Sequence, residues 1–137
     1  SLVSLDLSNN NIYGTIPTSL GDLNSLGSLS LKSNQLTGTI PTAVGFLTSL
    51  YYMELYSNYL TGFFPTTIAT MSSLSVVDIT SNYLTGSVPS ELCELVNLGD
   101  NNLNCKITCA LDKIGYCTYC NLKTEKIFLL FFFVLLI

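Results

Sequence analysis

Apolar residues recur along the chain with a period of 24 positions, from Leu2 to residue 97. Counted from Leu2, positions 4 and 6 of each unit alternate with polar or variable residues, which is typical of a strand with one buried face. Apolar residues at positions 11, 15, 19 and 22 continue the pattern, and the last of these are spaced as in a short or 3₁₀ helix. The expected strand residues at positions 1, 4 and 6 are Leu2, Leu5, Leu7; Leu26, Leu29, Leu31; Leu50, Met53, Leu55; and Leu74, Val77, Ile79.

Three polar or special residues share the same period. Position 9 is always Asn, position 13 always Gly and position 16 always Pro, and these are all the prolines of the chain. We expect the Asn amide to bond backbone groups where the chain bends after the strand, so that stacked units form an asparagine ladder. Gly permits a backbone conformation closed to other residues, and Pro ends a short extended Gly-x-Ile-Pro segment. The ladder residues are Asn10, Asn34, Asn58 and Asn82.

A single unit has an apolar side that it cannot bury alone. Stacked units share one continuous core, so about three or more are needed for stability. We therefore predict an α/β-type solenoid, mostly β, with a parallel sheet and short or 3₁₀ helices. The predicted units are 2–25, 26–49, 50–73 and 74–97, followed by a partial unit 98–104 in which five residues are missing.

The charge and composition of the chain exclude several classes of function. Residues 1–104 carry seven acidic residues and one base, Lys32, and the whole chain has a net charge of −4. Such a surface does not suit nucleic acid, whose phosphates need a basic partner. The chain has no histidine, which excludes Ser-His and Cys-His catalysis and histidine metal sites. We expect a protein that is not an enzyme and uses no cofactor.

The pattern L-x-x-L-x-L-x-x-N-x-L-x-G-x-I-P-x-x-L-G-x-L-x-x-L resembles the plant-type leucine-rich repeat. It is found in the ectodomains of receptor-like kinases and receptor-like proteins, and in the related secreted polygalacturonase inhibitors. The resemblance implies a right-handed superhelix whose parallel sheet is concave, with the helices on the convex side. It also implies recognition of a peptide or protein ligand, with a co-receptor as a further partner, on that sheet.

Candidate ligand contacts lie at the outward strand positions 2, 3, 5, 7 and 8. The third unit places three tyrosines and a carboxylate on one strand, and amphipathic rings suit a protein contact; alternatively, Tyr is simply favoured in strands. Position 5 forms a column of Asp6, Ser30, Glu54 and Asp78, which either selects a basic peptide or is a solvated face. The candidate residues are Tyr51, Tyr52, Glu54, Tyr56, Asp78, Lys32 and Asp6.

The chain has five cysteines, all near the C-terminal end of the repeats: Cys93 lies in the last complete unit, and the other four follow it. We expect residues 105–122 to form a cysteine-rich cap for the apolar end of the solenoid, with disulfides as the first interpretation. A zinc site formed by four thiolates and reduced cysteines are the alternatives, and the expected assignment includes no metal. The disulfide candidates are Cys93, Cys105, Cys109, Cys117 and Cys120.

Residues 123–137 form an apolar tail, in which 127–137 are eleven consecutive apolar residues. This is about half of the roughly 20 residues that a membrane-spanning helix needs. We expect a truncated membrane segment, with a lipid-anchor signal and an artefact of the gene model as alternatives. Because the chain also starts at Ser1 within a unit, we interpret it as a fragment of a plasma-membrane receptor with extracellular repeats. The alternative is a secreted inhibitor or cell-wall interaction protein.

Overall fold

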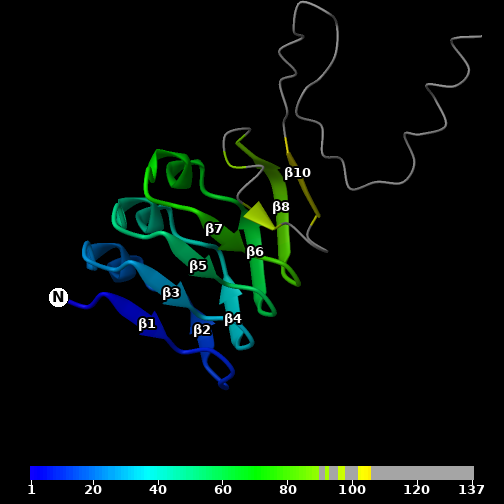
Figure 1. The fold of residues 1–137 in the computed structure, drawn as a ribbon. Coiled ribbons are helices and arrows are strands. Elements are labelled where there is room, and N and C mark those ends of the chain that lie inside the picture. The colour runs from blue at the N-terminus through cyan, green and yellow to red at the C-terminus, as the bar shows by residue number, and fades with distance from the viewer. Residues whose placement is uncertain (90–91, 93–95, 98–101, 106–137) are drawn as a thin grey trace, which may run out of the picture. The chain divides into compact units, whose positions relative to one another are not determined.

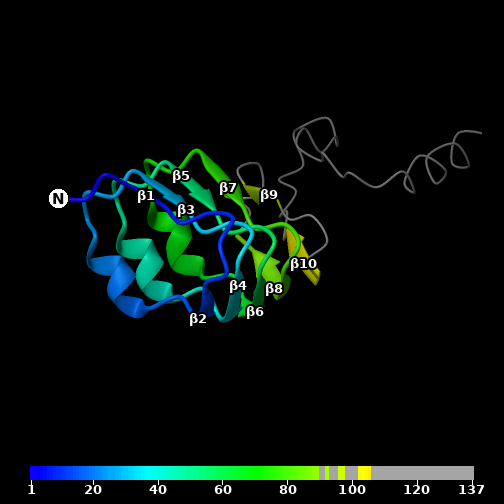
Figure 2. The same ribbon diagram turned by 90° about the horizontal axis from the view of Figure 1, so that it is seen from below.

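A computed structural model of the chain describes residues 1–89, 92, 96–97 and 102–105. The chain divides into two units, Ser1–Ile107 and Thr108–Ile137, and all described residues belong to the first. Each successive turn of this unit contributes one strand to each of two parallel sheets, which lie on different sides of the turns (Figures 1 and 2). The predicted solenoid of stacked turns, mostly β, is confirmed.

The first sheet contains the strands that the leucine periodicity predicts. Its order is β1-β3-β5-β7-β9, so each strand pairs with that of the next turn. Leu5 pairs with Leu29, Leu29 with Met53 and Met53 with Val77, so the rungs are spaced by one repeat of 24 residues. The strands are β1 (Ser4–Asp6), β3 (Ser28–Ser30), β5 (Tyr52–Glu54), β7 (Val76–Asp78) and β9 (Val96–Asn97).

The second sheet lies after the asparagine bend, and its order is β10-β8-β6-β4-β2. Its strands begin before the Gly-x-Ile-Pro segment that the sequence indicated, and β4 already ends at Gly38. The reason is that Leu36 points into the core between exposed Gln35 and Thr37, which is itself a strand alternation. The strands are β2 (Tyr13–Thr15), β4 (Gln35–Gly38), β6 (Tyr59–Phe63), β8 (Tyr83–Val88) and β10 (Asn102–Cys105).

Three 3₁₀ helices, η1 (Thr18–Asp22), η2 (Thr42–Phe46) and η3 (Thr66–Thr70), follow the prolines of the first three turns. Each begins after a proline in the extended conformation, which fits a residue that fixes φ and lacks an N–H. The helices turn Leu20, Val44 and Ile68 into the core. They stack on one another on the side of the turns away from the first sheet (Figure 2), as predicted.

One apolar core runs through the stacked turns. It contains the predicted strand positions of the inner turns, such as Leu29, Met53 and Val77, which are completely buried. The first turn is more open: Leu2 and Leu7 are 45% and 38% exposed, because on one side they lack the turn that covers the equivalent residues further along.

The predicted asparagine ladder is present, and it joins neighbouring turns as well as closing each bend. Asn58 Nδ2 donates to the carbonyls of Leu55 (3.0 Å) in its own turn and Leu31 (3.0 Å) in the preceding turn. Its Oδ1 accepts a hydrogen bond from the N–H of Leu36, also in the preceding turn (3.0 Å). Asn34 and Asn82 repeat this arrangement. Each of these amides therefore bonds buried backbone groups of two turns.

The bend also uses a backbone conformation that the sequence did not reveal. Position 8, just before the ladder asparagine, has a positive φ of 51° to 55° at Asn9, Ser33, Ser57 and Ser81. This left-handed conformation is uncommon for residues other than glycine. The glycine at position 13 has a positive φ as well, for example 80° at Gly62, which confirms the conformational role expected for it.

Asn58→Ala should lower the free energy of unfolding by about 1–3 kcal/mol, because it leaves buried backbone groups of two turns unpaired. Asn10→Ala is the matched control. Asn10 is exposed, and its Nδ2 donates to the carbonyls of Leu7 and Ser8 in its own turn, so we expect a smaller loss. Urea unfolding of both variants measures the difference, and equal losses would refute a ladder that couples the turns.

Candidate functional site

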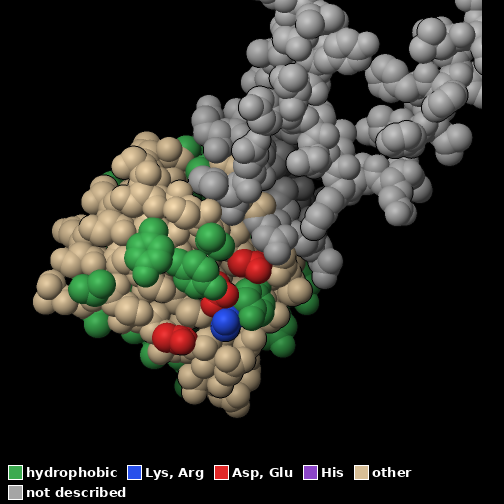
Figure 3. All heavy atoms as spheres, in the orientation of Figure 1, with side chains coloured by type: hydrophobic (Ala, Val, Ile, Leu, Met, Phe, Trp, Pro, Cys, Tyr) green, Lys and Arg blue, Asp and Glu red, His purple; other side chains and the backbone are tan. Residues whose placement is uncertain are grey.

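The predicted ligand residues lie on the outward face of the first sheet, centred on β5. Hydrophobic, acidic and basic side chains gather there in one area, with the lysine between carboxylates (Figure 3). Because the strands are in register, Glu54 of β5 stands between Ser30 of β3 and Asp78 of β7. The structure therefore brings together side chains that are 22 to 24 residues apart in the sequence.

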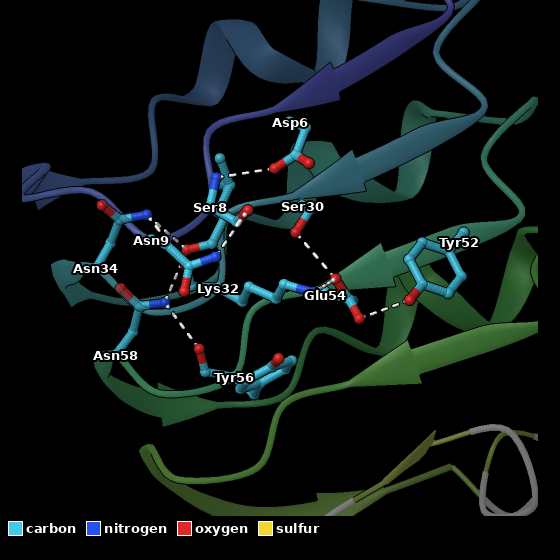
Figure 4. Close-up of polar contacts among 11 residues, drawn as sticks. Asp6, Ser8, Asn9, Ser30, Lys32, Asn34, Tyr52, Glu54, Tyr56 and Asn58 are labelled. Atoms are coloured by element: carbon cyan, nitrogen blue, oxygen red, sulfur yellow. Dashed lines mark hydrogen bonds and ion pairs between the residues drawn. The ribbon is translucent and has the colours of Figure 1, made fainter.

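Glu54 is the centre of this arrangement (Figure 4). Its Oε2 forms an ion pair with Lys32 Nζ at 2.8 Å and accepts a hydrogen bond from Ser30 Oγ at 2.9 Å. Its Oε1 accepts a hydrogen bond from the hydroxyl of Tyr52 at 2.5 Å. Such charge-assisted bonds are among the stronger ones in proteins. They hold all four side chains, called here the Glu54 cluster, in a defined arrangement.

The cluster perturbs the acid–base properties of its members. Burial raises the pKa of Glu54, but hydrogen bonds from Lys32, Tyr52 and Ser30 outweigh it, so the pKa is lowered overall. The hydrogen bond with Glu54 raises the pKa of Lys32 to about 12 and also raises the pKa of Tyr52. At neutral pH the cluster therefore contains one carboxylate, one ammonium group and a neutral phenol.

Two further tyrosines flank the cluster along the same strand. Lys32 Nζ lies 5.4 Å from the centre of the Tyr56 ring, within the range of a cation–π contact. At the other end, Tyr51 is 54% exposed, and its ring lies over Gly27, where a Cβ would stand only 3.0 Å from Tyr51 Cε1. Tyr51 is thus supported from beneath and remains accessible from above.

The two aspartates of the acidic column have a local role. The backbone N–H of Ser8 donates to Asp6 Oδ1 (2.9 Å), and that of Thr80 donates to Asp78 Oδ1 (3.0 Å). Each carboxylate thus caps the turn that follows its own strand, as short acidic side chains often do. Hydrogen bonds from the side chain and backbone of Ser8 lower the pKa of Asp6. The positive charge of Lys32 also contributes to lowering the pKa of Asp6.

Sequence reasoning missed two residues of this face. Ser30 was placed on the exposed side of the strand, but it is only 6% exposed because it supports Glu54. Val76 stands opposite Tyr52 on the neighbouring strand and is 43% exposed. The 24-residue register alone would have placed both beside β5, although it does not give their exposure.

Other predicted sites fall largely outside the described residues. Of the five cysteines, Cys105 alone has a described backbone, in β10, and no described side chain, so the cap, the disulfides and the zinc alternative all lie outside them. The tail 123–137 lies outside as well. Residues 1–89 and the short described segments beyond contain no cluster of potential metal ligands. In the same part of the chain, no helix has the length and apolarity needed to cross a membrane.

Comparison with known proteins agrees with the stacked turns and the asparagine ladder of the structure. Two family models, both described as leucine-rich repeat, match residues 1–60 and 73–95, together more than half of the chain. The chain belongs to the leucine-rich-repeat family. No curated protein sequence matches it.

Solved structures of plant receptors resemble this leucine-rich-repeat chain. The PEPR1–AtPEP1 complex is 38% identical over 75% of this chain and 15% of its own, with a TM-score of 0.71. The BIR3–SERK2 complex from Arabidopsis thaliana is 34% identical over 76% of this chain and 56% of its own, with a TM-score of 0.70. Arabidopsis HAESA, solved with the peptide hormone IDA and the co-receptor SERK1, is 35% identical over 74% and 18%, with a TM-score of 0.66. The chain thus spans from less than a fifth to just over half of these proteins.

The Glu54 cluster should make the free energy of unfolding depend on pH in the acidic range. Because the folded-state pKa of Glu54 lies below the ordinary value of 4.5, its carboxylate stabilises the fold above that pH, and the contribution disappears as the pH falls through the lowered pKa. We expect Glu54→Gln to lose less stability than the wild type between about pH 6 and about pH 3 in urea unfolding. Asp22→Asn, which removes an exposed carboxylate in η1, is the control. An unchanged pH dependence in Glu54→Gln would contradict the cluster.

Proposed function

We propose that the outward face of the first sheet binds a peptide or protein ligand, without catalysis. The observation that carries the proposal is the exposed patch formed by Tyr51, Tyr52 and Val76 beside the Glu54 cluster. Tyr51 and Val76 are 54% and 43% exposed, and Tyr52 pairs with Val76 across β5 and β7. Large aromatic side chains dominate the energy of many protein interfaces, because they bury much area at a small entropic cost.

The hydrogen bonds support this proposal through preorganisation. Tyr52 is held by Glu54, and Tyr51 rests on Gly27. A ligand that docks on these rings loses little free energy to ordering them, since the rings are already in place. The pairing of β5 with β3 and β7 holds the backbone of Tyr52 in place as well.

The charges of the face favour a ligand with a basic group. Lys32 and Glu54 neutralise each other at 2.8 Å, so their pair contributes little net charge. Asp6, which is exposed, adds a further carboxylate to the described part of this face and makes it acidic. Charge complementarity of this kind steers association and sets specificity more than affinity. We therefore infer a ligand that combines an apolar or aromatic side chain with a Lys, an Arg or a free amino group.

The proposal also covers the location of the protein, its C-terminal cap, its membrane attachment and a second partner. Among the similar structures, HAESA is a receptor kinase bound to a peptide hormone and a co-receptor, and RGFR1 is a plant peptide hormone receptor. By analogy, we infer extracellular repeats of a plasma-membrane receptor, a C-terminal cap closed by disulfides among Cys93, Cys105, Cys109, Cys117 and Cys120, and a membrane attachment through the tail 123–137. A co-receptor is the inferred second partner. Signalling would then be carried by other segments or chains.

A random peptide library displayed on phage tests the ligand proposal. Peptides selected on the full chain should bind Tyr51→Ala about tenfold more weakly, or worse, because the ring is a central contact. Tyr13→Ala is the control, since Tyr13 is 84% exposed but lies on β2 of the second sheet. Selected peptides should also be enriched in Lys or Arg. Peptides that bind both variants equally well, or that lack basic residues, would refute the proposed face.

Fractionation tests the membrane attachment. The chain produced in plant cells should remain with the membrane pellet after washing with high salt or alkaline carbonate, and detergent should release it. A variant that ends at residue 122 should be released without detergent, because it lacks the eleven apolar residues of the tail. Release of the complete chain by salt alone would contradict the attachment and favour a secreted protein.

A further inference from the structure

The outward face of the second sheet differs from the first in its chemistry. Strand alternation exposes positions 10, 12 and 14 of each turn, for example Tyr59, Thr61 and Phe63 on β6. Among the residues at these positions in the four turns, none carries a charge. They are Asn11, Tyr13 and Thr15; Gln35, Thr37 and Thr39; Tyr59, Thr61 and Phe63; and Tyr83, Thr85 and Ser87.

Position 12 forms a row of threonines across this face. Thr37, Thr61 and Thr85 each donate a hydrogen bond to the carbonyl of a glycine in the preceding turn, at 3.2, 3.4 and 3.5 Å. These bonds fix the hydroxyl groups in one repeating direction. The face is therefore an ordered array of hydroxyl groups and aromatic rings, without the ion pairs that dominate the first sheet.

Two of its rings form a distinct feature. Tyr59 and Tyr83, at the same position of neighbouring turns, have ring planes within 10° of parallel and centres 6.3 Å apart. This separation exceeds the roughly 3.5–4.0 Å of a full carbon–carbon contact, so neither ring can be fully covered by the other. Both rings remain accessible, at 50% and 62% exposed.

A depression of about 440 Å³ opens beside these rings. Its lining includes Tyr59 and Tyr83, the serines Ser57 and Ser81, and the ladder asparagines behind them. A volume of this size falls within the range of about 300–1,000 Å³ that is usual for small-molecule sites. Hydroxyl groups and aromatic rings line it, and no charged side chain does.

We propose that this face binds a neutral saccharide, with one sugar unit packed against the exposed sides of the stacked Tyr59 and Tyr83 rings. A pyranose ring has apolar C–H faces that pack on aromatic rings, and its hydroxyl groups both donate and accept hydrogen bonds, as do Ser and Tyr hydroxyls. An anionic polysaccharide would need a basic partner, and this face has none. The repeat places threonines at equivalent positions of three turns, Thr37, Thr61 and Thr85, and tyrosines at equivalent positions of two, Tyr59 and Tyr83. An extended chain of sugar units is therefore favoured over a single sugar.

Isothermal titration calorimetry of the full chain with cellohexaose and xylohexaose tests this inference. The chain is kept in a zwitterionic detergent, because a detergent with a sugar head group would compete. We expect at least one of the two neutral hexamers to bind, and Tyr59→Ala and Tyr83→Ala each to weaken that binding about tenfold or more. Tyr59→Phe should bind nearly as well as the wild type, because the ring is retained.

The controls distinguish binding at this site from nonspecific binding and from binding at the first sheet. Tyr13→Ala removes a ring of the same sheet that is more exposed than those of Tyr59 and Tyr83, and Tyr51→Ala removes a ring of the first sheet. Both variants should bind the hexamer as the wild type does. Hexagalacturonate, the anionic control, should bind weakly or not at all. Thermal unfolding confirms that each variant is folded. The proposal is overturned if neither neutral hexamer binds, if Tyr13→Ala weakens binding as much as Tyr83→Ala, or if hexagalacturonate binds as tightly.

Discussion

The structure depends on the need to satisfy backbone groups at a bend that is repeated in every turn. After each strand of the first sheet the chain turns away through a residue with positive φ, and backbone carbonyl and amide groups on either side of this bend are buried. Buried groups of this kind are costly when unpaired. The ladder asparagine satisfies them in its own turn and in the turn before it, as Asn58 does with Leu55, Leu31 and Leu36. One side chain thereby closes a turn and fixes its stacking.

The strands of the two sheets lie on either side of this bend, and the two sheets differ in register. Among β1, β3, β5 and β7 of the first sheet, paired residues are 24 positions apart, as in Leu5 and Leu29, and between β7 and β9 they are 19 apart, as in Val77 and Val96. On the second sheet, paired residues of the complete turns are 22 apart, as in Thr61 and Tyr83. The second sheet is therefore staggered by two residues, with Tyr83 opposite Thr61. Between β8 and β10 the offset is 17 residues, from Thr85 to Asn102, because the partial fifth unit is five residues shorter. The second sheet nevertheless continues, since Leu103 pairs with Gly86 as Leu84 pairs with Gly62.

The same scaffold presents two surfaces of opposite character. The first sheet concentrates charge around Glu54, whose partners come from two strands, and we assign peptide recognition to it. At the outward positions of its four complete turns, the second sheet presents hydroxyl, amide and aromatic groups, and we propose that it binds a neutral saccharide. Neither surface disturbs the core, because strand alternation separates the outward positions from the buried leucines. A protein built this way can vary both faces while the ladder and the core stay unchanged.

By itself, the sequence determined the period, the buried positions, the ladder asparagines and the glycine and proline of each bend, because in a repeat every turn must solve the same packing problem. The family resemblance added the expectation that a ligand binds on the first sheet. Only the tertiary structure decided which outward residues meet. Lys32 reaches Glu54 from position 7 of one turn to position 5 of the next, Ser30 is buried by that contact, and Asp6 and Asp78 turn back to cap their own strands. These contacts depend on side-chain direction and on the stagger between strands, and a periodic pattern of apolar residues constrains neither.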